Sequence, residues 1–121
     1  MLETYLNYIH ESSNEYLIRK WIKEKVPKSP PKSKTPYGRC ITYAGALSTI
    51  FDGKLMKGEN TKMHSGNTSH FWSIIDGKEY DPTGHWYPGG KNINGKEISI
   101  SKNKDFFDND PIYQKLISEG K

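Results

Sequence analysis

The first part of the chain carries apolar residues at the spacing of a helix. They are Leu2, Tyr5, Leu6, Ile9, Tyr16, Leu17, Trp21 and Ile22. Apolar residues at every third or fourth position form a stripe along one side of a helix. Ser12 and Glu15 have the spacing of a capping box, where a second helix can begin, and Pro27 ends the pattern. The sequence therefore predicts either one kinked helix or two short ones ahead of Pro27.

A second helical pattern begins at the only cysteine of the chain. The connector before it, KSPPKSKTP at residues 28–36, predicts an extended surface loop. The spacing i, i+4, i+7, i+11 then predicts a buried stripe made of Cys40, Ala44, Leu47 and Phe51. Gly53 follows as a typical C-terminal stop. We therefore expect a helix that begins at Cys40 and ends near Gly53.

The pattern changes from helix to strand between residues 69 and 83. Asp76-Gly77 is a two-residue turn signal between two strand-like runs, and Pro82 ends the pairing. With that turn as the loop, alternation places one set of side chains on one face, namely His70, Trp72, Ile74, Glu79 and Asp81. His70 and Asp81 then lie diagonally across the pair, with β-carbons roughly 5–8 Å apart. The sequence thus predicts a hairpin that brings an imidazole and a carboxylate together.

The remaining segments are shorter and more polar. We expect a short strand at 55–56, a polar loop at 58–68, an aromatic and glycine-rich loop at 84–90, a turn at 92–95, a short strand at 97–100 and a last helix that Asp110 and Pro111 begin. Together these elements predict an α+β fold. In this fold the helix that begins at Cys40 packs on a small antiparallel sheet, and helices flank that core at both termini.

Composition places this fold in one domain, residues 1–121. A chain of this length supplies one hydrophobic core. It has no long apolar run, so we expect no membrane span and no membrane partner. Its start lacks the basic and apolar pattern of a secretory signal. The single cysteine rules out an internal disulfide, which fits a reducing, cytoplasmic location.

Positive charge is concentrated in the N-terminal half. The net charge is +4, and the basic residues concerned include Lys20, Lys23, Lys25, Lys28, Lys32, Lys34 and Arg39. Such a surface can bind an acidic protein or nucleic acid, although most basic surfaces are only solvated. Aromatic residues do not alternate with these lysines, as they would on a surface that stacks bases. Nucleic-acid binding is therefore the weaker alternative.

Three residues are candidates for catalysis: Cys40, His70 and Asp81. The first turn of a helix offers unpaired N–H groups and the positive end of the helix dipole, and both favour a thiolate at Cys40. His70 would hold the thiolate as an ion pair and protonate a leaving group, while Asp81 would orient the imidazole. Ordinary alternatives exist, because a lone cysteine is more often a small buried side chain and an Asp before Pro is often a turn residue.

The histidines lack the spacing of a metal site. His64, His70 and His85 could join Cys40 or Asp81 around zinc, but neither His-x-x-x-His nor Cys-x-x-Cys spacing occurs. We therefore expect no metal and no cofactor.

A family resemblance rests on eight positions of the chain. Gly-x-Cys opens a helix, His-x-Trp-x-x-x-x-Gly covers a strand and its turn, and Asp-Pro-Thr follows; the residues are Gly38, Cys40, His70, Trp72, Gly77, Asp81, Pro82 and Thr83. This pattern resembles the transglutaminase-like branch of the papain-like cysteine enzymes. The resemblance implies a cysteine-bearing helix packed on an antiparallel sheet, with Cys40, His70 and Asp81 as the triad. Members cleave, cross-link or deamidate amides, and some are inactive, so the substrate is not implied.

The expected function is acyl transfer at an amide bond through a thioester. Hydrolysis is favoured over cross-linking, because nothing in the sequence marks a second site for an amine. The expected partner is a protein or peptide substrate, which can be acidic, and the candidate substrate-binding residues are Tyr37, Trp72, His85 and Trp86. The Cys40 N–H is one oxyanion donor, and the second is open among Tyr37, Thr35 and Asn14. A catalytically silent binding module on the same scaffold is the main alternative.

Overall fold

The computed structural model describes residues 2–30, 39–63 and 69–121, and within residues 2–13 it describes the backbone alone. The α-helices are α1 (Leu2–Lys25), α2 (Cys40–Ile50), α3 (Lys104–Asp108) and α4 (Pro111–Glu119). The strands are β1 (Lys54–Asn60), β2 (His70–Ile75), β3 (Lys78–Tyr80) and β4 (Asn92–Ile98). Short 3-10 turns lie at Gly84–Trp86 and Ser101–Asn103. Most of the 28–36 connector, with Tyr37, Gly38, Thr35 and His64, lies outside the described residues.

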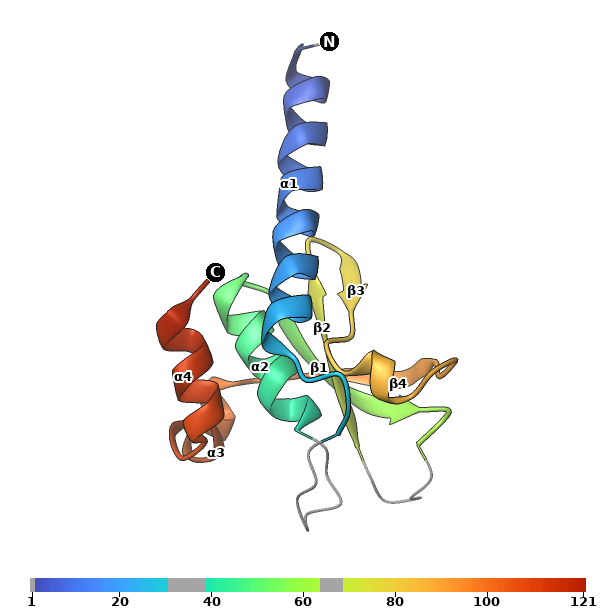
Figure 1. Cartoon of the computed structure of the whole chain (residues 1–121), viewed down its shortest axis with the longest axis vertical. Coiled ribbons are helices and arrows are strands. Elements are labelled where there is room, and N and C mark those ends of the chain that lie inside the picture. Colours follow the sequence, from blue (N-terminus) through green and yellow to red (C-terminus); the bar gives the residue numbers. More distant parts are fainter. Residues whose placement is uncertain (1, 31–38, 64–68) are drawn as a thin grey trace.

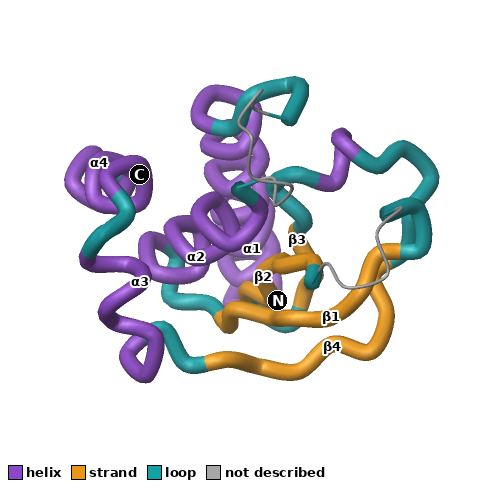
Figure 2. Tube along the Cα trace, turned by 90° about the horizontal axis from the view of Figure 1, so that it is seen from below, coloured by secondary structure: helices purple, strands orange, loops and turns teal. Residues whose placement is uncertain are grey.

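The expected α+β class is confirmed. The four strands form one antiparallel sheet in the order β3-β2-β1-β4. Figure 2 shows α2 and α4 gathered to one side of these strands. The core between the layers takes Trp21 from α1, Leu47 from α2, Leu55 and Ile75 from the sheet, and Leu116 from α4. Burial of these apolar side chains drives the helices onto the sheet.

Helix α1 is continuous, which decides between the two forms that the N-terminal pattern allowed. It runs without a break past the Ser12–Glu15 segment, and its last turn ends before Pro27 as predicted. Ile18 and Trp21 anchor the second half of the helix in the core. The first half stands clear of the rest of the domain (Figure 1).

Helix α2 begins at Cys40, and the predicted stripe on it is buried. Its end differs in detail from the prediction. Asp52, and not Gly53, has the left-handed backbone, with φ 54°. A β-carbon at Gly53 would lie 2.7 Å from the carbonyl oxygen of Ile74. The glycine is therefore needed for close approach to β2 rather than for its φ angle.

Buried hydroxyl groups fix α2 to its neighbours. Ser73 Oγ on β2 donates to the Ala44 carbonyl at 3.0 Å and accepts from Ser48 Oγ at 2.8 Å. Thr42 Oγ1 donates to Asp110 Oδ2 at 2.5 Å, at the start of α4. These bonds fix how far α2 lies along β2 and along α4. Because Cys40 is the first residue of α2, they also fix its position relative to the sheet.

The predicted hairpin and its register are confirmed. Ile75 pairs with Lys78, and the two turn residues Asp76 and Gly77 have φ 52° and 78°. Positive φ at both positions is the geometry that an Asp-Gly turn supplies best. Strand β2 runs from His70 to Ile75, so His70 lies at the end of the hairpin away from the turn.

Two sequence predictions about β1 and β4 are wrong. Residues 58–60 belong to β1 rather than to a polar loop, and residues 92–95 belong to β4 rather than to a turn. The Asn94-Gly95 turn signal is absorbed as a bulge, because Asn94 has φ 56° and the pairing shifts between Lys57 and Glu59. Helix α3 was not predicted, whereas the start of α4 was: Asp110 caps the N–H groups of Ile112 and Tyr113.

Candidate active site

The three predicted catalytic residues lie at the ends of three different elements. Cys40 is the first residue of α2, His70 is the first residue of β2, and Asp81 directly follows β3. The hairpin register carries Asp81 back beside His70, and the packing of α2 on β2 carries Cys40 to the same place. No two of these residues are closer than eleven positions in the chain, so the cluster is a product of the fold.

His70 and Asp81 are joined by a short hydrogen bond. His70 Nε2 and Asp81 Oδ2 are 2.7 Å apart, and His70 is 0% exposed. An ionised carboxylate can only accept, so Nε2 carries the proton in this pair. Among the described residues, Nδ1 of the same ring has no hydrogen-bond partner. The ring therefore has one nitrogen held by the acid and the other available.

Cys40 lies beside the imidazole, without a hydrogen bond of standard geometry to it. Its Sγ is 4.0 Å from the Ser69 carbonyl oxygen, which is at the outer limit for sulfur, and the residue is 4% exposed. Burial lowers the pKa of His70, but interactions with Asp81 and with Cys40 outweigh burial and raise that pKa to about 9. The imidazole is thus an imidazolium over the neutral range, and it stands next to a sulfur.

Two aromatic rings enclose the imidazole. Trp72 stacks on it with 5.9 Å between centroids and 26° between planes. Tyr87 meets it edge to face at 5.6 Å and 84°. Burial, together with the charges of Cys40 and Asp81, raises the pKa of the Tyr87 hydroxyl. Tyr87 therefore borders the imidazole, and it belongs to the aromatic and glycine-rich loop that the sequence predicts at residues 84–90.

Of the predicted substrate-binding residues, Trp72 contacts the imidazole, whereas His85 and Trp86 contact the segment after α1. Trp72 is 3% exposed and lies behind the imidazole, with its indole against Gly58 and Gly95. His85 Nε2 and Trp86 Nε1 both bond to the Pro27 carbonyl oxygen, at 2.5 and 2.9 Å. These two side chains tie the 84–86 turn to the end of α1. Tyr37 lies outside the described residues.

One of the open oxyanion donors is not near the site. Asn14 Nδ2 donates to Asp76 Oδ2 at 2.5 Å, at the turn end of the hairpin, while His70 is at the opposite end of β2. The start of α2 remains suited to the task, because its N-cap Arg39 makes no side-chain hydrogen bond to the first turn. Unpaired N–H groups at a helix start can stabilise a developing oxyanion.

Asn92 is a member of the cluster that sequence reasoning missed. Its Nδ2 donates to Asp81 Oδ2 at 3.0 Å and to Glu79 Oε1 at 3.1 Å. Its Oδ1 accepts from Asn60 Nδ2 at 2.8 Å. These asparagines come from β4 and β1, in segments that the sequence predicted as a turn and a loop. The Asn-Gly pair nearby signalled only a turn, so no local pattern pointed to Asn92.

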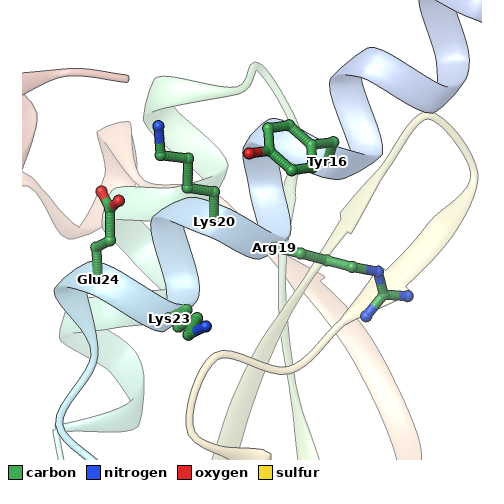
Figure 3. A pocket seen from close by; sticks show the side chains of 5 residues that line it. All are labelled: Tyr16, Arg19, Lys20, Lys23 and Glu24. Atoms are coloured by element: carbon green, nitrogen blue, oxygen red, sulfur yellow. The ribbon is translucent and has the colours of Figure 1, made fainter.

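A pocket formed by described residues reaches the cluster at Asp81. It has a volume of about 250 Å³ and is lined by Arg19, Ile22, Lys23, Glu79, Tyr80 and Asp81. A larger pocket of about 540 Å³ lies on α1, lined by Tyr16, Arg19, Lys20, Lys23 and Glu24. Figure 3 shows that these five side chains leave one helix in different directions. They do not converge, so the smaller pocket is the better candidate for a substrate.

Within residues 14–30, 39–63 and 69–121, no group of three His, Cys, Asp or Glu side chains could hold a metal ion. In the described part of the chain, the helices are too short or too polar to cross a membrane. Comparison with protein-family models, with curated proteins and with solved structures finds no match to this chain. The function is therefore inferred from the geometry of the cluster itself.

Proposed function

We propose that this protein transfers an acyl group at an amide bond, most simply by hydrolysis, with Cys40 as nucleophile, His70 as general acid and base, and Asp81 as the residue that orients His70. One observation carries the proposal. The imidazole is held by Asp81 through Nε2 and stands beside the Cys40 sulfur, and Nδ1 has no hydrogen-bond partner in the described part of the chain. A thiol enzyme needs this order of acid, imidazole and sulfur. We include in the proposal a core of the transglutaminase-like or papain-like type.

The reaction would proceed in two steps. The Cys40 thiolate attacks the amide carbon, and His70 gives the Nδ1 proton to the leaving amine as the C–N bond breaks. Water then attacks the thioester, His70 takes a proton from the water, and the acid leaves as the sulfur is released. Asp81 stabilises the imidazolium in both steps. The N–H groups at the start of α2 are the natural donors to the oxyanion.

The substrate proposed is a protein or peptide whose side chains can be acidic. Arg19 and Lys23 line the pocket that reaches Asp81, next to the apolar Ile22. A chain lying there would have cationic groups and an apolar surface within reach. Hydrolysis remains the simpler reaction, because a cross-linking enzyme would need a second site for the incoming amine.

The second candidate is a catalytically silent binding module, and one observation favours it. Cys40 is 4% exposed and His70 is 0% exposed, so a substrate carbonyl can reach the sulfur only if neighbouring side chains move. An enzyme makes that movement when substrate binds, whereas a silent module has no need of it. Reactivity of the sulfur separates the two.

Alkylation of Cys40 by iodoacetamide tests the proposal, since the chain has no other thiol. An ion pair with His70 should let native Cys40 react well below pH 8, whereas an ordinary thiol titrates near pH 8.5 and reacts only as it does so. His70→Ala should lose the reaction at low pH. His85→Ala, which changes an exposed histidine outside the cluster, should retain it. The urea-unfolded chain gives the rate of the unperturbed thiol.

A reaction that rises only above about pH 8 in the native protein, as for a free thiol, would favour the silent module. If the low-pH reaction is present, incubation with peptide mixtures and mass spectrometry of the intact protein should reveal an acyl adduct on Cys40. Its mass would then identify the acyl group. Cys40→Ser is the matched control, because its ester adduct should not form at a comparable rate.

A further inference from the structure

The side chain of Asn92 gives the acid a second hydrogen bond, on the same oxygen that binds the imidazole. Asp81 Oδ2 accepts from His70 Nε2 at 2.7 Å and from Asn92 Nδ2 at 3.0 Å. The same Nδ2 lies 3.1 Å from Glu79 Oε1. An amide nitrogen carries two hydrogens, so both are used on carboxylates. Two donors therefore converge on one oxygen of Asp81, one from the imidazole and one from β4.

The amide of Asn92 is fixed in one orientation. Asn60 Nδ2 donates to Asn92 Oδ1 at 2.8 Å, and Asn60 Oδ1 accepts from the backbone N–H of Lys62 at 3.0 Å. A backbone N–H can only donate and a carboxylate can only accept, so this chain of bonds has one direction. Flipping either amide would set donor against donor or acceptor against acceptor. Asn60 is 6% exposed, and Gly90 packs against it so closely that a β-carbon there would displace it.

We propose that Asn92 is a positioning residue, which fixes the Asp81 carboxylate so that His70 presents Nδ1 to Cys40. Asn92 donates to Asp81 and does not take part in the bonds that form or break. Without this donor the carboxylate can rotate, and the bond to Nε2 loses its direction. This role rests on the proposed function, although its effect on the imidazole can be measured without a substrate.

The test follows the tautomer of His70 by ¹⁵N NMR above the pKa of the ring. In the wild type we expect the neutral ring to hold its proton on Nε2 alone. Asn92→Ala should give a mixture of Nε2–H and Nδ1–H forms. It should also slow alkylation of Cys40 at pH 6 by about 10- to 100-fold, the range found when outer hydrogen-bond partners are removed from metal sites. Asn92→Gln keeps an amide donor and should recover part of both.

Asn94→Gly is the matched control. Asn94 is on the same strand, and its Nδ2 donates to an exposed carboxylate, Glu59 Oε2, at 2.7 Å. Glycine keeps the positive φ that this position requires. The control should match the wild type in both measurements. Asn92→Leu, which keeps the volume of the side chain, replaces Asn92→Ala if that variant does not fold.

The outcomes separate this role from the hydrolase itself. A single Nε2–H tautomer in Asn92→Ala would overturn the role of Asn92, even if the wild type hydrolyses amides. A mixture of tautomers in Asn92→Ala, in a protein on which no acyl adduct forms, would remove the hydrolase and leave the coupling between Asn92 and His70 established.

Discussion

Two carboxylates are held on either side of the start of α2, and they are held in different ways. Asp110 uses both oxygens on fixed donors: Oδ1 accepts from two backbone N–H groups of α4, and Oδ2 accepts from the buried Thr42 hydroxyl. Asp81 binds an imidazole through Oδ2, and its Oδ1 has no hydrogen-bond partner among the described residues. Burial of a carboxylate therefore says little about function, and the identity of its donors says more.

The difference lies in what the donors can do. A backbone N–H, a threonine hydroxyl and the Arg39 guanidinium, whose Nη1 lies 3.8 Å from Asp110 Oδ1, all keep their protons at any physiological pH. The contacts of Asp110 therefore join α2 to α4. An imidazole can gain or lose a proton, and the one beside Asp81 stands next to a sulfur. Asp81 is thus placed to influence a proton transfer, and Asp110 is placed to hold a helix.

The largest expected effect comes from exchanging each acid for its amide. Asp81→Asn should slow any amide hydrolysis by about 10³-fold or more, because an amide can stabilise the wrong tautomer of the imidazole. It should slow alkylation of Cys40 at pH 6 by at most about 300-fold, since an ordinary thiol with a pKa near 8.5 is still roughly 0.3% thiolate at that pH. Asp110→Asn should change either rate by no more than a few-fold. Equal rates in the two variants would remove the distinction between the two acids.

Truncation of Asp110 to alanine should lower the stability of the fold. Asp110→Ala removes the N-cap of α4, which costs about 1 kcal/mol. It also leaves the buried Thr42 hydroxyl without its acceptor, which costs about 1–3 kcal/mol more. Urea unfolding should therefore show a loss of about 2–4 kcal/mol in the free energy of unfolding, the sum of these two contributions. Asp110→Asn, a good N-cap, should recover much of it, and a failure to do so would argue against the cap.

Stability should depend on pH through His70. Its folded pKa is raised from 6.5 to about 9, so the protonated ring is favoured in the folded state. The resulting stability is fully present below about pH 6.5 and is lost as the pH rises through about 9. The decrease should be at most about 3 kcal/mol, since one pKa unit corresponds to about 1.4 kcal/mol. Urea unfolding at pH 6, 7.5 and 9 measures it.

Two variants check the origin of that pH dependence. Asp81→Asn removes the charge that favours the imidazolium, so its unfolding free energy should vary less between pH 6 and 9. Asp110→Asn should keep the slope of the wild type. A slope unchanged in Asp81→Asn would show that another group titrates in this range.

The smallest expected effect is that of Thr42→Val. This change keeps the shape of the side chain and removes the donor to Asp110 Oδ2. The free energy of unfolding should fall by about 1.5–3 kcal/mol, as expected for one buried hydrogen bond to a charged group. Cys40 alkylation at pH 6 should stay unchanged. A slower alkylation would mean that the join between α2 and α4 also sets the position of the sulfur.

Local sequence signals were enough for the parts of the molecule that short-range physics decides. The Asp76-Gly77 turn set the hairpin register, and that register brought His70 and Asp81 onto one face. The apolar stripe of α2 located Cys40 at a helix start. The family resemblance predicted that the sulfur lies near the imidazole. No local pattern predicted it, because it depends on how far α2 lies along β2 when the two pack together.

The extent of β1 and β4, and the residues that these strands contribute to the cluster, could not be predicted in the same way. Residues 58–60 and 92–95 are polar, and each segment has a glycine, Gly58 or Gly95, where the Trp72 indole needs room. That requirement comes from a residue on a different strand, and it gives both segments the composition of loops. Asn92 joins the cluster through the same long-range pairing, so no spacing within the sequence marks it.

The two glycines facing Trp72 have a consequence for how this domain can change. A β-carbon on either would lie 2.6 Å from the indole ring, so a methyl group at either position would push against the ring that stacks on the imidazole. Gly95→Ala replaces one small residue by another on the edge strand β4. It would nevertheless shift the Trp72 indole, which stacks on the His70 imidazole. A side chain at Gly95 thus calls for a smaller residue in place of Trp72, whereas a β-carbon at Gly58 would also lie 2.5 Å from the Ile93 carbonyl oxygen.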